Sequence, residues 1–153
     1  MPTLDTFDKK ILSLLQQDNR ISQRELAQQV NLSASAINRR IASMEKTGVI
    51  KNSVTLVDSV KVGRPITLIV EVSLSDERLT RINEAKKVFA TCPQIQQIYY
   101  VTGEFDFVLI MNVCDMAEYE ELTQRLFFQS GNVQRFRTMV SMHNVKQGLE
   151  VVL

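Results

Sequence analysis

The sequence predicts an α+β protein, with an N-terminal helix-turn-helix (winged-helix-like) domain and a C-terminal ferredoxin-like βαββαβ αβ-sandwich domain. Capped segments of helical periodicity fill the chain up to Gly48, and alternation of apolar and polar residues begins at Ile66. A segment with Gly63 and Pro65 lies between them. We therefore place the helix-turn-helix domain at 1–57, a hinge linker at 58–65, and a second domain at 66–153, to which the arguments below assign ligand binding and dimerisation.

The composition fits two small cytoplasmic domains. The chain has 153 residues, of which 44% are hydrophobic and 23% are charged, so each half can bury a core. No apolar run approaches the roughly 18 residues of a membrane span, and the N-terminus has no signal-peptide pattern. The net charge of +1 excludes a strongly basic nucleic-acid binder. Cys92 and Cys114 are expected to be reduced, buried thiols rather than redox sensors.

Three helices are predicted in the first 48 residues. Asp5 is the expected N-cap of the first, and Ser22 with Glu25 forms a capping box for the second. Asn31 should stop the second helix in the left-handed conformation, since asparagine tolerates positive φ. Ser33 should cap a third helix that runs to about Thr47 and is closed by Gly48. The expected core is Leu15, Leu26, Val30, Leu32, Ile37 and Ile41.

The third helix carries small and polar residues opposite its apolar stripe. These residues are Ser35, Arg39, Ala42, Ser43 and Lys46, flanked by Asn38 and Arg40. Small side chains allow close approach to a DNA major groove, while Arg and Asn can bind base edges or phosphates. The same pattern also fits an ordinary amphipathic helix with a solvated charged face, and these residues alone do not decide between the two interpretations.

The segments after Gly48 predict extended structure and then a second domain. Val49–Ile50 and Val54–Val57 can form a small wing, and the strand from Ile66 begins the order β-α-β-β-α-β. The later expected elements are a helix at 76–91 that buries Leu79, strands at 95–102 and 105–113 joined by a tight turn at Gly103–Glu104, a helix from Asp115 to Gly131 that buries Met116, and a strand at 133–145.

The third predicted strand of this domain is apolar on both faces. Phe107, Leu109 and Met111 alternate with Val108 and Ile110. Both helices of such a unit cover the same side of the sheet, so the other side needs a different cover. An open apolar sheet face is typical of an interaction site, and we therefore expect sheet-to-sheet dimerisation.

Several short motifs, spaced along nearly the whole chain, make it resemble the Lrp/AsnC ("feast/famine") family of bacterial and archaeal transcription regulators. The matching segments are Leu4-Asp5, Asp8 and Ile11-Leu12; Asp18–Ser22, Glu25-Leu26 and Val30–Ser33; Arg40, Met44-Glu45, Gly48 and Ile50; and Val101–Phe107 (VTGEFDF), Asp115-Met116 and Tyr119. The resemblance implies binding to double-stranded DNA, dimers that often assemble into octamers, and a nucleoid-associated protein of the cytoplasm.

The resemblance also implies a small effector, usually an amino acid, bound between subunits near the Gly103 hairpin. The effector-binding candidates carried over by position are Val101, Thr102, Gly103, Glu104, Asp106, Met116, Met139, Val140 and Ser141. Hairpin amides and Thr102 can hold a carboxylate, Asp106 can attract an ammonium group, and the Met and Val side chains can receive an apolar tail.

The DNA-binding candidates are Ser33, Ser35, Asn38, Arg39, Arg40, Ser43 and Lys46. We assign Asn38 and Arg39 to base edges and place Arg40 and Lys46 nearer the DNA backbone. Each cation can instead contact phosphates or pair with Glu45, and Arg40 can be structural because it lies nearer the buried stripe. Two departures from the family pattern are Ser33–Ile37 (SASAI), where many relatives have Ser-Pro-x-Pro-Cys, and Met139, where an aromatic residue is common. They leave the operator sequence and the effector's identity open.

We expect no catalytic residue, no metal site and no cofactor. Glu104 and Asp106 form a carboxylate pair without a nearby His, Lys or nucleophile, and Glu118, Glu120 and Glu121 fit a solvated helix face. Two alternatives stay open. Some tetrapyrrole-processing (sirohaem decarboxylase-like) enzymes share this architecture and need histidine, which keeps His143 in view. The chain can also be an effector-binding module that has lost DNA binding.

Overall fold

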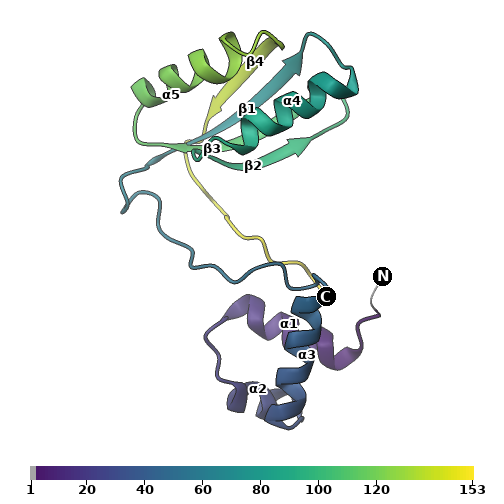
Figure 1. Ribbon diagram of the computed structural model, residues 1–153. Helices are drawn as coiled ribbons and strands as arrows, with labels where there is room; N and C mark the ends of the chain where they lie inside the picture. The colour runs from purple at the N-terminus through teal and green to yellow at the C-terminus, as the bar shows by residue number, and fades with distance from the viewer. Residues whose placement is uncertain (1–2) are drawn as a thin grey trace. The chain divides into compact units, whose positions relative to one another are not determined.

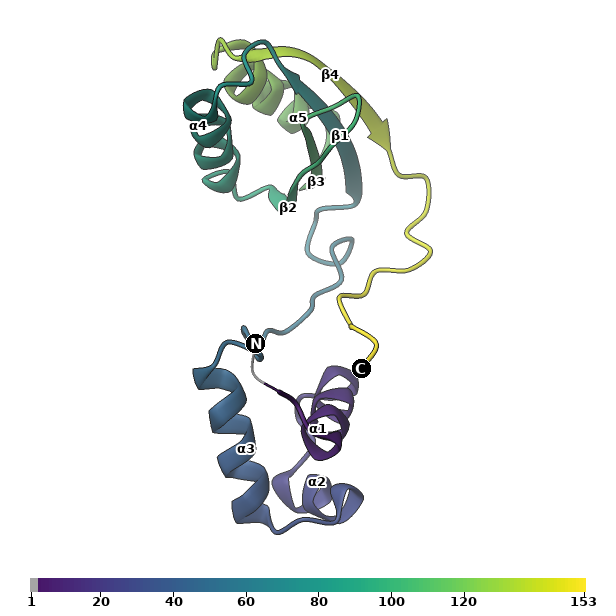
Figure 2. The same ribbon diagram turned by 90° about the vertical axis from the view of Figure 1, so that its right-hand side faces the viewer.

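The computed structural model describes residues 3–153 and divides them into two compact units (Figures 1 and 2). The helical unit comprises the chain up to Leu56 together with Lys146–Leu153, and the sheet unit comprises Val57–Val145. The last residues of the chain therefore group with the helices, whereas the sequence assigns them to the second domain.

The helical unit contains α1 (Thr6–Gln17), α2 (Gln23–Val30) and α3 (Ala34–Lys46). Each helix begins at the residue that its cap predicts. Asp5 and Asp8 cap each other's backbone amides at α1, and Ser22 and Glu25 do the same at α2. Asn31 ends α2 with a φ of 59°, and Gly48 follows α3 with a φ of 74°. Local hydrogen bonding therefore determines where these helices begin and end.

The residues at the centre of the helical unit's core are only partly the expected ones. Ile11, Leu26 and Ile37 are almost completely buried, whereas Leu15, Leu32 and Ile41 only pack against this core. The extended pieces predicted at 49–50 and 54–57 are not paired into a strand. Val49 and Ile50 instead pack against the helical core, and the Ile50 amide donates to the Met44 carbonyl.

The sheet unit contains β1 (Ile66–Leu74), α4 (Leu79–Ala90), β2 (Ile95–Tyr100), β3 (Phe107–Val113), α5 (Met116–Thr123) with a π-helical continuation η1 (Gln124–Phe128), and β4 (Val133–Val140). Its antiparallel sheet has the strand order β2-β3-β1-β4, and this confirms the predicted βαββαβ topology. Both helices pack on one face of the sheet (Figure 2).

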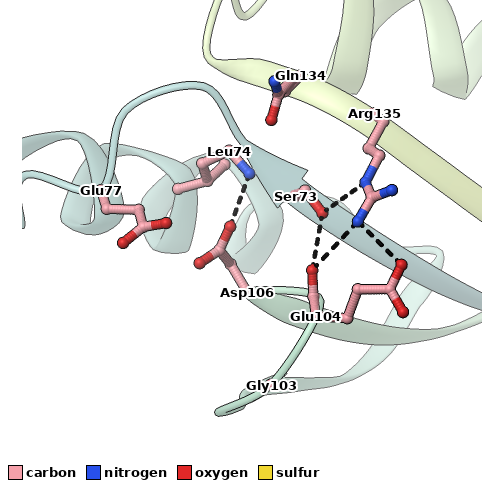
Figure 3. Close-up of a pocket in the computed structure, with 8 residues that line it drawn as sticks. All are labelled: Ser73, Leu74, Glu77, Gly103, Glu104, Asp106, Gln134 and Arg135. Atoms are coloured by element: carbon pink, nitrogen blue, oxygen red, sulfur yellow. Dashed lines mark hydrogen bonds and ion pairs between the residues drawn. The ribbon is translucent and has the colours of Figure 1, made fainter.

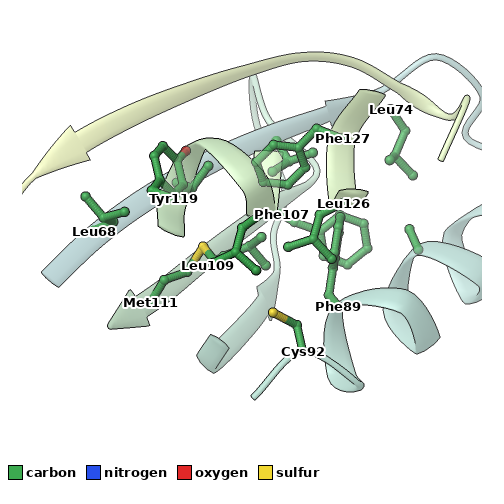
Figure 4. Close-up of a cluster of buried hydrophobic side chains, with 14 of the residues drawn as sticks. Leu68, Leu74, Phe89, Cys92, Phe107, Leu109, Met111, Tyr119, Leu126 and Phe127 are labelled. Atoms are coloured by element: carbon green, nitrogen blue, oxygen red, sulfur yellow. The ribbon is translucent and has the colours of Figure 1, made fainter. Parts of the chain in front are cut away.

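Alternate residues of β1 and β3 form the core between the sheet and the helices (Figure 4). Phe107 lies at its centre, with its ring 5.4 Å from that of Phe89 on α4 in an edge-to-face arrangement. Phe127, on η1, packs against Phe89 from the other helix at 6.2 Å. Such aromatic pairs add stability beyond the burial of their area.

Several boundaries predicted for the sheet unit are wrong. β4 ends at Val140 rather than at 145, and the connection between β2 and β3 spans residues 101–106 rather than a tight turn. Leu79 and Met116, which we expected to be buried, are 77% and 48% exposed. Both are the first residues of their helices, so a side chain there projects beyond the covered part of the sheet.

Glu118 is not the solvated residue that its helix pattern suggests. Its carboxylate accepts hydrogen bonds from the Cys114 amide, from Gln94 Nε2 and from Arg64 Nη1, at 2.7, 2.8 and 3.0 Å. These bonds lower its pKa from 4.5 to about 2, with the Cys114 amide as the largest contributor. Glu118 thus connects the hinge, the turn before β2 and the start of α5.

We expect Glu118→Gln to destabilise the sheet unit in a pH-dependent way. Because the folded-state pKa lies below that of the unfolded chain, the stability contributed by Glu118 is present above about pH 5 and is lost as the pH falls toward 2. Urea unfolding between pH 7 and 3 should therefore show a stability gap between wild type and variant that narrows with acid. Glu120→Gln, on the exposed side of α5, is the matched control, and a gap independent of pH contradicts the assignment.

Candidate nucleic-acid interface and effector pocket

The turn between α2 and α3 presents the third helix. Asn31 in the left-handed conformation reverses the chain, and the Ser33 hydroxyl then accepts a hydrogen bond from the Ala36 amide at 3.2 Å. Ser33 Oγ also lies 3.1 Å from Ser35 Oγ. Ile37 and Met44 anchor α3 in the core, so its opposite side faces outward.

That outward side forms what we call the polar ridge. Its members are all exposed: Ser35, Asn38, Arg39, Ala42, Ser43 and Lys46. Within residues 3–153, Arg39 and Lys46 form no ion pair, and neither pairs with Glu45. Both cations are therefore available to a ligand, and the small residues between them leave room for its close approach.

Arg40 lies next to the ridge but has a different environment. Its Nη1 donates to Asp5 Oδ2 at 2.8 Å and to Asp8 Oδ1 at 2.7 Å, and its guanidinium lies 5.5 Å from the Phe7 ring centre. The two carboxylates raise the pKa of Arg40. Among the roles that the sequence leaves open for Arg40, these bonds correspond to the structural one, because they tie α3 to the start of α1.

A hollow beside the ridge was not expected from the sequence. It has a volume of about 360 Å³ and is lined by Thr3, Leu4, Asp8, Arg39, Arg40, Ser43, Met44 and Thr47. The segment before α1 thus lies against the second half of α3. Only the tertiary fold brings these two segments together, because more than thirty positions separate them.

In the sheet unit, the loop between β2 and β3 borders a polar pocket of about 280 Å³ (Figure 3). We call this the hairpin pocket. It is lined by Ser73, Leu74, Glu77, Gly103, Glu104, Asp106, Gln134 and Arg135. Three of the effector-binding candidates, Gly103, Glu104 and Asp106, line it directly, and Val101 and Thr102 belong to the same loop.

Asp106 holds this loop against β1. Its Oδ2 accepts a hydrogen bond from the Leu74 amide at 2.7 Å, and its own amide donates to the Val72 carbonyl at 2.9 Å. The Asp106 carbonyl accepts from the Val101 amide, which closes the loop. Gly103 has a φ of 128°, a conformation that favours glycine. Asp106 is therefore partly structural, and it keeps Oδ1 for a ligand.

Five residues that line this pocket are not among the sequence-based candidates, and Arg135 is the one cation among them. Its guanidinium donates to Ser73 Oγ at 3.4 Å and to Glu104 Oε1 at 3.1 Å, and it lies 5.1 Å from the Phe105 ring centre. The Arg137 guanidinium lies 5.0 Å from the centre of the same ring. Alternation along β4 could have pointed to both arginines, because they lie on the face opposite Phe136.

The remaining effector-binding candidates do not reach the hairpin pocket of the same subunit. Met139 pairs with Ile69 and Val140 with Leu68, while the Ser141 amide donates to the Thr67 carbonyl. Met116 follows the end of β3, where Val113 pairs with Ile66. Since Asp106 binds Leu74, the two groups lie at opposite ends of β1, about 20 Å apart at the usual rise per residue.

The features that could indicate other chemistry are few. Between Thr3 and Leu153 no group of three or more His, Cys, Asp or Glu side chains is placed to hold a metal ion. His143 is exposed, and its Nδ1 lies near the Met142 carbonyl oxygen. Cys92 is buried as expected, but Cys114 is exposed, which corrects that prediction. No described helix combines the length and the apolar character that crossing a membrane requires.

Comparison with known families divides the chain as its fold does. The family described as winged helix-turn-helix DNA-binding matches residues 4–51. The family described as Lrp/AsnC ligand binding domain matches residues 67–151, which is more than half of the chain.

Individual proteins agree with this assignment. The chain is 41% identical over 143 residues to an HTH-type transcriptional regulator of Sinorhizobium fredii, covering 94% of this chain and 85% of the relative. It is 34% identical over 150 residues to the leucine-responsive regulatory protein of Haemophilus influenzae, covering 98% and 90%. The crystal structure of an AsnC family transcriptional regulator from Agrobacterium tumefaciens superposes with a TM-score of 0.90 at 29% identity, covering 97% and 96%. The chain belongs to the Lrp/AsnC family of DNA-binding transcription regulators.

Proposed function

We propose that this regulator binds double-stranded DNA through the polar ridge of α3, as a dimer or larger assembly whose activity responds to an amino acid. The observation that supports this most directly is the pair of exposed, unpaired cations Arg39 and Lys46 on a helix otherwise lined by small residues. Asn38 and Arg39 would read base edges, and Lys46 would contact the backbone. Ser33, Ser35 and Ser43 would approach phosphates.

The open face of the sheet supports self-association. Ile69, Val108, Ile110 and Met139 lie on the face that neither α4 nor α5 covers, and Met139 is 39% exposed. A second copy placed face to face about a two-fold axis would bury this apolar strip. The net charge of +1 per chain makes pairing useful for DNA binding, since two ridges double the electrostatic contact. Assembly of dimers into octamers is part of the same proposal.

Pairing also explains why the effector-binding candidates lie at two ends of β1. A two-fold axis across the open face would place the hairpin pocket of one copy near Met116, Met139, Val140 and Ser141 of the other. The pocket would hold the charged groups of an amino acid, with Asp106 Oδ1 facing its ammonium and the loop amides of Thr102–Glu104 facing its carboxylate. The partner's residues would receive its side chain.

We further propose that the chain is not an enzyme and acts in the cytoplasm on the nucleoid. Glu104 is paired with Arg135, and Asp106 is bound to the Leu74 amide, so both carboxylates have structural partners. The exposed position of His143 gives no support to a tetrapyrrole-processing reaction. Names of relatives such as the leucine-responsive regulatory protein and the glutamate uptake regulatory protein of Zymomonas mobilis support an amino-acid effector.

The DNA contact is tested by Arg39→Ala and Lys46→Ala. We expect Arg39→Ala to weaken binding to a selected duplex by about 1–3 kcal/mol and to relax specificity at one base pair. Lys46→Ala should weaken binding to all duplexes and reduce the dependence of affinity on salt. Fluorescence anisotropy with duplexes selected by the wild-type protein from a random pool measures both effects.

Arg40→Ala is the matched control, because Arg40 is adjacent to Arg39 and is bound to Asp5 and Asp8. It should lower the melting temperature of the helical unit, whereas Arg39→Ala and Lys46→Ala should leave it unchanged. Unaltered affinity of both ridge variants argues against the contact surface. If the wild type selects no duplex, the chain is an effector-binding module without DNA binding.

The effector is tested by thermal-shift screening of the twenty amino acids. A ligand at 100 times its Kd should add about 2.7 kcal/mol to the free energy of unfolding. Asp106→Asn should abolish this shift, because it keeps an oxygen for the Leu74 amide and removes the charge that faces the ammonium. Glu120→Gln should leave the shift intact. An unchanged shift in Asp106→Asn places the ligand elsewhere, and no shift with any amino acid rejects this effector class.

A further inference from the structure

The hairpin pocket is lined by more acidic than basic side chains. Its acidic residues are Glu77, Glu104 and Asp106, and Arg135 is the one cation among the eight residues that line it. The lining therefore carries an excess of two negative charges. An amino acid with an uncharged side chain is a zwitterion and does not offset this excess, whereas one with a basic side chain brings a net positive charge. The charge of the pocket thus favours a basic ligand.

The arginines that follow Glu77 in the sequence do not neutralise it, because they pair with other carboxylates. Arg78 Nε donates to both carboxylate oxygens of Asp76, at 3.0 and 2.8 Å. Arg81, on α4, donates to Glu84 at 2.9 Å. Within residues 3–153 the Glu77 carboxylate forms no hydrogen bond and no ion pair. Glu77 is therefore an uncompensated charge at the edge of the pocket.

Two carboxylates of the pocket keep oxygen atoms for a ligand. Glu104 Oε1 accepts from Arg135 at 3.1 Å, so this acid is compensated within the pocket. Asp106 uses Oδ2 for the Leu74 amide, which leaves Oδ1. Glu77, in the segment between β1 and α4, keeps both of its oxygens and lines the same pocket as Asp106, in the loop before β3 (Figure 3). The pocket thus offers two anionic groups, on two different segments, to the cationic groups of a ligand.

The size and polarity of the pocket also favour a small, charged ligand. At about 280 Å³ it lies near the lower limit, about 300 Å³, of the pockets that hold drug-sized molecules, so it has room for a whole amino acid. Among its lining residues only Leu74 has an aliphatic side chain, and all others except Gly103 carry a polar group. An aliphatic side chain would find little apolar surface there, whereas a cationic group would exchange water for carboxylates.

We infer that the effector is an amino acid with a cationic side chain, whose α-ammonium binds Asp106 and whose second cationic group binds Glu77. Glu77 is then the residue that determines specificity, and it repels an acidic amino acid. The methylene groups between the two cations are the part of the side chain that the apolar residues of the other subunit would receive. The inference rests on the function proposed above, and the match of residues 67–151 to a ligand binding domain independently supports a ligand in this unit.

The selectivity is tested with matched pairs of amino acids, whose Kd values are measured from thermal shifts of the full-length protein at increasing ligand concentration. Lysine is compared with norleucine, ornithine with norvaline, and glutamate with glutamine, so that the members of each pair differ mainly by one charge. We expect lysine and ornithine to bind about fivefold more tightly than their uncharged partners, and glutamate to bind more weakly than glutamine. Higher salt should reduce these differences.

Glu77→Gln tests the residue itself, because it keeps the size of the side chain and removes its charge. We expect this variant to bind lysine about fivefold more weakly than wild type, with unchanged binding of norleucine and an unchanged melting temperature without ligand. Glu120→Gln, which removes an exposed carboxylate of α5, should behave as wild type. Wild-type affinity for lysine in Glu77→Gln overturns the role of Glu77.

The outcomes separate this inference from the proposed function. If norleucine or glutamine shifts the melting curve of the wild type and lysine and ornithine bind no more tightly than their uncharged partners, the cationic effector is refuted and the amino-acid effector stands. If no amino acid shifts the curve, the proposed effector class is refuted, and this selectivity is refuted with it.

Discussion

The arrangement of the sheet unit depends on the handedness of its two crossovers. A strand, a helix and a parallel strand of the same sheet connect in the right-handed sense, and here each crossover skips one strand, so α4 and α5 are placed on the same face of the sheet. β1 therefore has one face of Leu68, Val70 and Val72 that is completely buried, and another with Ile69 and Glu71 that is only partly covered. The open face follows from topology: neither α4 nor α5 covers it, and its apolar residues Ile69, Val108 and Ile110 are only partly buried.

Sequence reasoning succeeded where the determining interactions are local. Asp5, Ser22 and Ser33 each cap a helix through bonds to residues three positions away, and Asn31 needs only its own backbone preference. It failed where a side chain is used by a distant segment. Arg135, Glu118 and Gln16 bind partners in segments distant in sequence, and alternation or helical periodicity describes only which face each one occupies.

Arg39 and Arg40 show how much depends on one step along a helix. A rotation of 100° separates the two side chains, and this directs Arg40 toward the carboxylates of Asp5 and Asp8 and Arg39 toward solvent. The Asp8 carboxylate has two roles: one oxygen accepts from the Asp5 amide at the start of α1, and the other accepts from Arg40 on α3. The capping box of α1 thus also fixes the tilt of α3, and the same arginine that a motif assigns to DNA holds the reading helix in position.

The end of the sheet at Ile66 carries both connections to the helical unit. Glu118 binds Arg64 in the hinge, and Thr67 accepts hydrogen bonds from Ser141 and Asn144 at the start of the tail. Asn112 also donates to Thr67 Oγ1 at 2.8 Å, so the hydroxyl is the acceptor for two amides. A ligand that displaces β4 at Met139–Ser141 by a fraction of an ångström must therefore change the bonds of Thr67. Thr67 directly follows Ile66, so these bonds hold the end of β4 beside the point where the hinge enters β1.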